Sequence, residues 1–154
     1  MLKILICCGG GFSSSYVTER MKKEVVEKGL QEEVYLEFYP FSLVKEKEAD
    51  FDIIMCCPHL KIYVERLLQE TTISVPIYLL PPKMYGFMQL EEIVADAKDI
   101  IEIYRTFPNN PVHFPGEEKL LRITRGVAYR NVNKKDSCFK SSIQLSFFIN
   151  NFHM

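Results

Sequence analysis

Short apolar runs alternate with segments of helical periodicity over about 105 residues at the start of the chain, and this alternation restricts the folds that the chain can adopt. The apolar runs cover residues 2–7, 34–38, 51–57 and 75–80. Residues 15–28, 60–70 and 90–104 instead carry apolar side chains three or four positions apart, which indicates amphipathic helices. This order predicts an α/β fold, in which an open, four-stranded parallel sheet has helices on both faces.

The character of the chain changes after Phe107. Prolines and asparagines fill residues 108–111 and stop the preceding helix, a basic and apolar stretch covers 119–130, and the last residues are apolar without a clear period. We therefore predict one domain over residues 1–107 and a C-terminal extension of unknown role over 108–154, partly disordered or packed on the domain. A solvated basic face or a surface for acidic partners or membrane would explain four cations there: Lys119, Arg122, Arg125 and Arg130.

Charge and cysteine usage exclude several classes of protein. The formal net charge of −1 gives no reason to expect nucleic-acid binding, and no apolar run approaches the roughly 18 residues that span a bilayer. The apolar stretch at the N-terminus is too short for a signal peptide, so we expect a cytoplasmic protein. There, cysteines stay reduced. No metal site or cofactor is expected, because the spacing CxxC is absent from the five cysteines: Cys7, Cys8, Cys56, Cys57 and Cys138.

The stretch KILICCGGGFSSS, residues 3–15, indicates where a ligand would bind. It places Cys8 at the carboxyl end of a predicted strand, directly before a glycine-rich loop and a helix, and open α/β folds bind ligands at such ends. A loop of small residues can turn several backbone N–H groups inward, and the helix N-terminus adds its own. We predict a phosphate-binding nest formed by Gly9, Gly10, Gly11, Phe12, Ser13, Ser14 and Ser15, with an exposed Phe12 that either docks a partner or packs locally.

A cysteine at such a loop has a chemical use. The N–H groups that bind phosphate also stabilise a thiolate, and a thiolate can attack phosphorus to form a phosphocysteine. We assign this role to Cys8, because Cys7 should still lie in the strand with its side chain in the core. The alternative is that the glycine-rich turn only packs and the cysteine is an inert small hydrophobe.

Two features separate a phosphoryl carrier from a phosphatase. Cysteine phosphatases use a C-x5-R loop, in which the arginine clamps the phosphoryl oxygens. Six positions after Cys8 the chain has Ser14, and six after Cys7 it has Ser13, so the arginine is missing. The chain also has no Asp-Pro pair to supply a general acid. Slow hydrolysis of the thiophosphate would suit a carrier, which keeps its phosphoryl group until an acceptor docks.

The pattern ILICCGGGFSSS resembles the N-terminus of the lactose/cellobiose-type enzyme IIB subunits of the bacterial phosphoenolpyruvate-dependent sugar phosphotransferase system. The stretches ADFDIIMCCPHLKIYVERL and PPKMYGFMQLEEIVADA resemble later parts of the same family, so the resemblance covers residues 1–107. It implies an open fold of the flavodoxin or low-molecular-weight-phosphatase type. It also implies a phosphotransferase that works in the cytoplasm and associates with a membrane permease.

The resemblance further implies a reaction and its partners. A phosphohistidine IIA protein would donate its phosphoryl group to Cys8, which would pass it to a cellobiose-, lactose- or β-glucoside-type sugar imported through a membrane IIC protein. Cys57 departs from the family, which commonly has glycine there, and we expect a core thiol rather than a redox partner for Cys8. Together with Pro58, His59 and Tyr85 it would border the site, although His59 could be a plain surface residue and Tyr85 part of a plain turn.

Two alternatives stay open at this point. One is a relative of low-molecular-weight cysteine phosphatases and arsenate reductases, which the missing arginine disfavours. The other is a non-catalytic regulatory module that keeps the fold and binds an anion or a partner without covalent phosphorylation.

Overall fold

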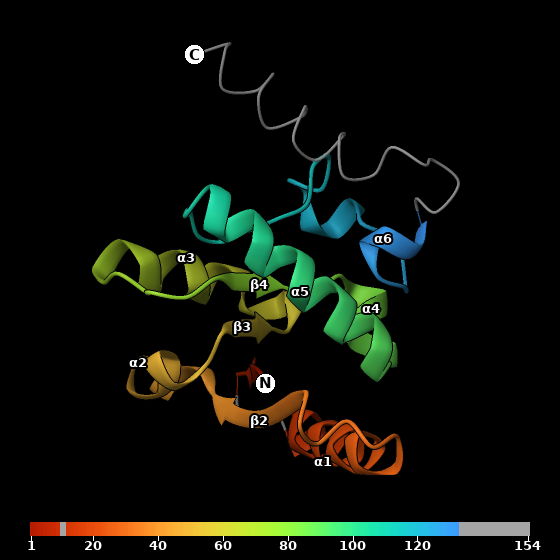
Figure 1. Ribbon diagram of the computed structural model, residues 1–154. Coiled ribbons are helices and arrows are strands. Elements are labelled where there is room, and N and C mark those ends of the chain that lie inside the picture. Colours follow the sequence, from red (N-terminus) through yellow and green to blue (C-terminus); the bar gives the residue numbers. More distant parts are fainter. Residues whose placement is uncertain (10–11, 133–154) are drawn as a thin grey trace.

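Figure 1 shows the computed structural model of the chain, which describes residues 1–9 and 12–132, without the side chains of residues 12–15. The strands are β1 (Leu2–Cys8), β2 (Val34–Pro40), β3 (Ile53–Cys56) and β4 (Ile77–Leu79). The α-helices are α1 (Phe12–Glu27), α2 (Val44–Lys47), α3 (Lys61–Glu70), α4 (Pro82–Phe87), α5 (Leu90–Thr106) and α6 (Tyr129–Val132). No helix in these described ranges is long and apolar enough to cross a membrane.

The four strands form one parallel sheet in the order β2-β1-β3-β4. In the register between the two central strands, Ile4 lies opposite Ile53 and Cys7 lies opposite Cys56. Both strands are buried on both faces, as their continuous apolar sequences indicate. The predicted four-stranded parallel sheet is confirmed.

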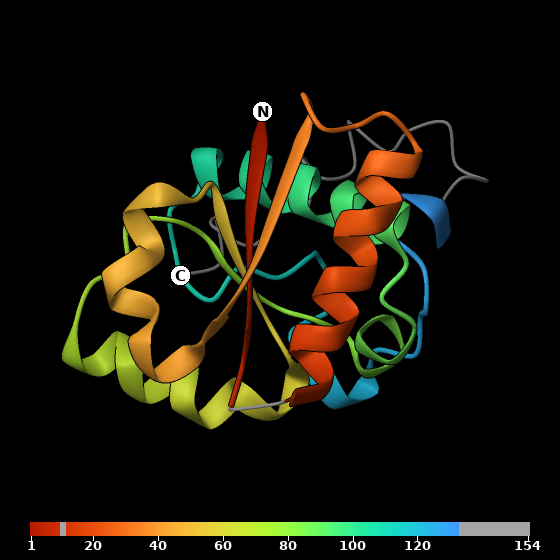
Figure 2. The ribbon, with the colours of Figure 1, turned by 90° about the horizontal axis from the view of Figure 1, so that it is seen from below.

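Helices cover the two faces of the sheet with separate apolar cores. On one face, α1 and α5 pack against the strand residues Ile4, Ile6, Ile53 and Met55. On the other face, α2 and α3 contribute to a core with Leu5, Cys7, Ile54 and Cys56. Figure 2 shows the two groups of helices on opposite sides of the strands, so the predicted layering is also confirmed.

One predicted turn is wrong. The alternative that placed Tyr85 and Gly86 in a plain turn fails, because both belong to helix α4. A proline in the first turn of a helix has a preset backbone angle and no N–H to lose, and Pro82 begins this helix. Helix α1 also begins at residue 12, three residues before the predicted start at 15.

The segment after α5 lies along the outer edge of β4. Val112 forms a parallel bridge with Tyr78, and its backbone N–H donates to the carbonyl of Ile77 at 2.8 Å. Just before this bridge, the side-chain amide of Asn110 accepts from the backbone N–H of Ile77 at 2.7 Å and donates to the carbonyl of Val75 at 2.9 Å. The described part of the extension is thus packed on the domain, whereas the boundary at residue 107 stays a prediction.

Phe114 fixes this segment to the core, and we expect its loss to destabilise the whole domain. Its side chain is fully buried, its ring stacks on Tyr129 with the centroids 4.3 Å apart, and it meets Tyr78 edge-on. Phe114→Ala should lower the free energy of unfolding by about 3–5 kcal/mol, since it removes apolar contacts and leaves a cavity. Urea denaturation followed by circular dichroism measures the change.

A matched control comes from the same segment. Leu121 is 86% exposed, so Leu121→Ala should change the free energy of unfolding by less than about 0.5 kcal/mol. If Phe114→Ala were as mild as this control, the extension would not be part of the folded core.

Candidate functional site

The central strands β1 and β3 define the place where this fold can bind a ligand. From β1 the chain crosses to β2 on one side, and β3 continues to β4 on the other side, so the strand order reverses between β1 and β3. Open α/β sheets bind their ligands beyond the carboxyl ends of the strands at such a point. Cys8 is the last residue of β1, and Cys57 directly follows β3 at the same end.

Three side chains meet at this point. The Sγ atoms of Cys8 and Cys57 and a ring nitrogen of His59 all lie within 4.8 Å of one another. Cys57 Sγ is 3.1 Å from Nε2 of His59, and the backbone N–H of Cys57 donates to the carbonyl of Cys7 at 3.1 Å. The sequence left open whether Cys57 contacts Cys8, and the structure brings the two thiols together.

Both cysteines of the first pair are buried, and Cys8 lies deeper than expected. Cys7 is buried in the core of one sheet face, as predicted. Cys8 was expected to open the loop, but it is still paired in the sheet, opposite Pro40 of β2, and is only 3% exposed. The pairing of β1 with β2 therefore extends one residue beyond the predicted end of the strand.

The pKa values of two thiols are raised. Burial, followed by the charge of Cys8 and a hydrogen bond with it, raises the pKa of Cys57 to about 12, although the backbone N–H groups of Gly9 and Cys57 act in the opposite direction. A hydrogen bond with Cys7, together with burial, raises the pKa of Cys56 well above its usual range. Both groups therefore keep their protons at neutral pH and are poor nucleophiles there.

The other predicted border residues surround this cluster. Pro58 begins a 3-10 helix, Pro58–Leu60, which turns the chain after β3, and His59 is exposed on it. The ring of His59 meets that of Tyr85 edge-on, with centroids 5.9 Å apart, so helix α4 contributes to the same region. The structure therefore brings Cys57, His59 and Tyr85 together near Cys8.

Most of the predicted phosphate nest lies outside the described part of the structure. Gly10 and Gly11, and the side chains of Phe12, Ser13, Ser14 and Ser15, belong to this group, so the nest stays a prediction. Gly9 is described and exposed, and a Cβ atom there would lie 3.7 Å from Cδ2 of Leu60, an ordinary contact distance. Packing alone therefore does not require glycine at position 9.

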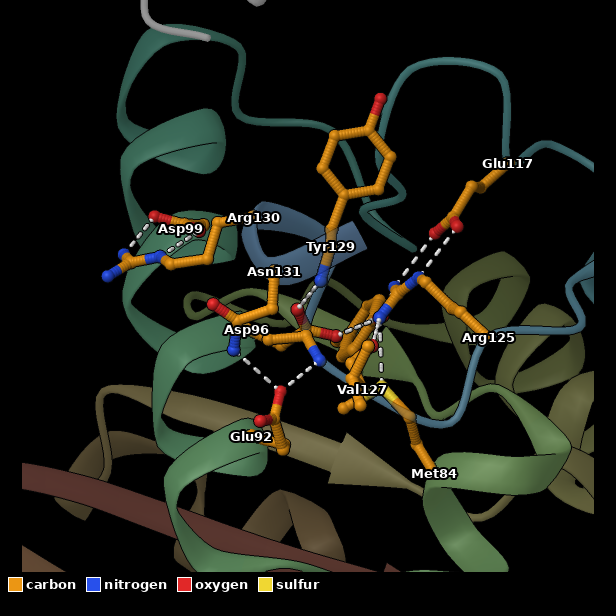
Figure 3. A network of polar contacts seen from close by, with 12 residues as sticks. Met84, Glu92, Asp96, Asp99, Glu117, Arg125, Val127, Tyr129, Arg130 and Asn131 are labelled. Carbon is orange, nitrogen blue, oxygen red and sulfur yellow. Dashed lines mark hydrogen bonds and ion pairs between the residues drawn. The ribbon is translucent and has the colours of Figure 1, made fainter. Parts of the chain in front are cut away.

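Two of the four cations singled out in the extension are not free surface charges, which corrects one reading of the sequence. Arg125 is 7% exposed and binds Asp96 and Glu117, as Figure 3 shows. It also donates to the hydroxyl of Tyr78 at 2.7 Å. Arg130 forms a two-pronged ion pair with Asp99 of α5. The sequence does not show this, because Asp96 lies 29 positions from Arg125 and Asp99 lies 31 positions from Arg130. Lys119 and Arg122 are exposed, as expected of a solvated face.

A surface hollow of about 570 Å³ also lies in the extension. Residues 115–119, 122–125, 129 and 132 line it, and none of Cys8, Cys57 and His59 does. Its one buried cation, Arg125, is already neutralised by Asp96 and Glu117. The hollow therefore offers no chemistry comparable to that of the thiol cluster.

An open parallel α/β domain with a cysteine at the carboxyl end of a central strand is the class of protein that the fold and the site define. The model of one family, described as the lactose/cellobiose-specific IIB subunit of the phosphotransferase system, matches residues 3–96, more than half of the chain. The chain belongs to this family of sugar-transport phosphotransferase components.

Solved structures agree with this fold. The chain is similar to the cellobiose-specific phosphotransferase IIB component from Borrelia burgdorferi, with 24% identity, a TM-score of 0.53, and coverage of 66% of this chain and 93% of that one. It also matches the lactose-specific IIB component domain from Streptococcus pneumoniae, with 12% identity, a TM-score of 0.44, and coverage of 70% and 98%. The first likeness supports the shared fold, and the second is too loose to carry an argument. No curated protein matches the chain.

Proposed function

We propose that the chain carries a phosphoryl group on Cys8 between a phosphohistidine IIA protein and a sugar that enters through a membrane IIC protein. The observation that supports this most directly is the position of Cys8 at the carboxyl end of β1, beside the point where the strand order reverses, in a member of the IIB family. The sugar would be of the cellobiose, lactose or β-glucoside type, as the family description suggests. The reaction places the protein in the cytoplasm, at the inner face of a permease.

The transfer takes place in two displacements. In the first, the sulfur of Cys8 attacks the phosphorus of phosphohistidine, so that a phosphorus–nitrogen bond breaks, a phosphorus–sulfur bond forms, and the thiol proton passes to the leaving imidazole. In the second, a sugar hydroxyl attacks the same phosphorus, the phosphorus–sulfur bond breaks, and the hydroxyl proton passes to the released Cys8 thiolate. Such transfers depend on in-line positioning and on stabilisation of the phosphoryl oxygens. The backbone amides of residues 9–11 and the helix α1 N-terminus are our candidates for that stabilisation.

The neighbouring thiols support the choice of Cys8 as the nucleophile. Cys56 and Cys57 are both held protonated by burial and by their sulfur neighbours, so neither supplies a thiolate at neutral pH. Cys7 is completely buried and faces Cys56 across the strand pair. Cys8 lies at the loop that leads to helix α1, where a phosphoryl donor would arrive.

The two alternatives make different predictions about a phosphothiol. A phosphatase would form it and hydrolyse it, whereas a regulatory module would never form it. The missing C-x5-R arginine disfavours the phosphatase, because nothing at that position of the loop can clamp the phosphoryl oxygens bidentately.

One experiment tests all three readings. The protein is incubated with phosphoenolpyruvate, the two general phosphotransfer proteins and a cognate IIA protein, and its intact mass is measured. We expect a gain of about 80 daltons, the mass of one phosphoryl group, which persists until a sugar and a IIC protein are added. Rapid loss of the added mass without acceptor, together with hydrolysis of para-nitrophenyl phosphate, would favour the phosphatase. No gain with several IIA proteins would favour the regulatory module.

A further inference from the structure

We propose that Cys8, Cys57 and His59 together form a binding site for a thiophilic metal ion, and that Zn²⁺ is the ion that this donor set selects. The inference goes beyond the proposed phosphoryl transfer, which needs only one of the three side chains. It starts from the observation that two thiols and an imidazole nitrogen, all ordinary zinc ligands, lie within 4.8 Å of one another.

The spacing of the donors is close to that of a tetrahedral site. Bonds of about 2.3 Å to sulfur and about 2.0–2.1 Å to nitrogen separate two sulfurs by about 3.8 Å, and a sulfur from a nitrogen by about 3.6 Å. The upper bound of 4.8 Å exceeds the sulfur–sulfur value by about 1 Å. The contact between Cys57 and Nε2 of His59, at 3.1 Å, is slightly shorter than the bound state needs. Small side-chain rotations would therefore close the site.

The donors are fixed by elements that do not need to rearrange. Cys8 ends β1 and Cys57 follows β3, and the two strands are hydrogen-bonded neighbours, so the sheet sets the position of both sulfurs. The backbone N–H of Leu60 donates to the carbonyl of Cys57 at 3.1 Å. This bond closes the short turn that carries His59 back toward the strand ends. Sites built on strands hold their ligands more precisely than sites on long loops.

The chemistry of the donors determines the class of ion. Thiolate and imidazole ligands suit zinc and other soft or borderline ions, whereas magnesium and calcium need oxygen ligands. Binding of one Zn²⁺ would release the protons of both thiols and form two zinc–sulfur bonds and one zinc–nitrogen bond. Three protein ligands leave one coordination position open. His59 is exposed, so an ion can approach from solvent while the sulfurs stay buried.

Metal binding would have a consequence for the proposed function, and this consequence rests on it. The sulfur of Cys8 cannot bind zinc and attack phosphorus at the same time. Zinc-bound protein should therefore not be phosphorylated, and removal of zinc with a chelator should restore phosphorylation.

The binding itself is tested with Co²⁺, a spectroscopic probe for zinc sites, on the full chain without oxygen. A Cys138→Ser background removes a cysteine that lies outside the described residues. We expect one Co²⁺ per chain, a near-ultraviolet charge-transfer band from thiolate to cobalt, and complete loss of that band when one equivalent of Zn²⁺ is added. Absence of the band, or a band without displacement by Zn²⁺, would overturn the proposal.

Single substitutions assign the ligands. Cys57→Ser and His59→Ala should each weaken Co²⁺ binding at least about tenfold, the equivalent of 1.4 kcal/mol per lost ligand. His113→Ala is the matched control, because His113 is also exposed but lies in the extension, and it should leave the band unchanged. An unchanged Co²⁺ affinity in Cys57→Ser, or an affinity that His113→Ala lowers as much as His59→Ala does, would show that the ion binds elsewhere and would refute the site.

A second measurement does not depend on variants that fold. Zn²⁺ is titrated into the unsubstituted chain by calorimetry in buffers of different ionisation enthalpy, which counts the protons released on binding. Two protons should leave per bound Zn²⁺, one from Cys8 and one from Cys57, and binding without proton release would contradict the proposal. If Co²⁺ binds as expected but no phosphoryl group is ever transferred, the metal site stands and the carrier function fails.

Discussion

Cys8→Ser should abolish phosphorylation by the phosphotransfer cascade, so that the gain of about 80 daltons disappears completely. The reason is the nucleophile: a serine hydroxyl has nearly the size of the thiol but ionises far less readily. The neighbouring thiol of Cys57 cannot take over, because its pKa of about 12 keeps it protonated. The measurement is the intact mass after incubation with phosphoenolpyruvate, the general phosphotransfer proteins and a IIA protein.

Cys7→Ser is the matched control for this variant. It makes the same chemical change one residue earlier in β1, at a side chain that faces the core and lies opposite Cys56. We expect the control to be phosphorylated like the parent chain, with circular dichroism used to check that both variants fold. If Cys8→Ser were still phosphorylated, or if only a folded Cys7→Ser lost its phosphorylation, Cys8 would not be the phosphoryl acceptor.

Arg125→Met should be the most destabilising change outside the apolar core. Asp96 is completely buried, and Arg125 is its ion-pair partner, with Nη1 2.8 Å from Oδ2. Loss of one member of a buried pair leaves an uncompensated charge, which costs about 3–5 kcal/mol of folding free energy. Methionine keeps much of the length of the side chain, so the expected loss reports mainly the charge. Urea denaturation at neutral pH measures it.

Two comparisons isolate the cause. Arg122→Met removes an exposed arginine from the same segment and should change the free energy of unfolding by less than about 0.5 kcal/mol. The double variant Asp96→Asn/Arg125→Met should be more stable than Arg125→Met alone, because position 96 no longer carries a buried unpaired charge. A double variant less stable than Arg125→Met would show that packing, and not charge, holds the extension.

The loss of stability in Arg125→Met should also depend on pH in a defined direction. Burial raises the pKa of Asp96, while the charge of Arg125 and the N–H of Tyr129 oppose that rise, so removal of Arg125 should raise this pKa further. A carboxyl group with a raised pKa in the folded state contributes more stability below its unfolded pKa, and that contribution is lost as the pH rises. The decrease in the free energy of unfolding caused by Arg125→Met should therefore be smaller at about pH 4 than at neutral pH.

Local patterns in the sequence predicted most of the domain. The apolar runs at residues 2–7 and 51–57 become the central strands because a strand buried on both faces has no polar positions. Helix α4, which Pro82 begins, was not predicted, since proline stops one element and begins the next equally well. The role of Asn110 could not be recognised from the sequence. Its side chain hydrogen-bonds the backbone of Val75 and Ile77, which lie more than thirty positions away.

Only the part of the candidate site that belongs to a local motif was predicted from the sequence. Cys8 stands in a local motif of strand, glycine loop and helix, which the sequence displays directly. The approach of Cys57 and His59 depends on strand order, because only adjacent β1 and β3 bring the two Cys-Cys pairs to one end of the sheet. One signal was available: two Cys-Cys pairs, each at the carboxyl end of an apolar run, can meet if their strands are neighbours.

The segment that follows α5 has an effect on how the molecule meets its neighbours. An uncovered outer strand offers its free amides and carbonyls to any extended chain, which leads to strand addition and aggregation. Along β4 these groups at residues 75–77 are taken by Asn110 and Val112 of the same chain. Growth of the sheet beyond β4 is therefore blocked from within, and contacts between copies through this edge must use side chains rather than backbone pairing.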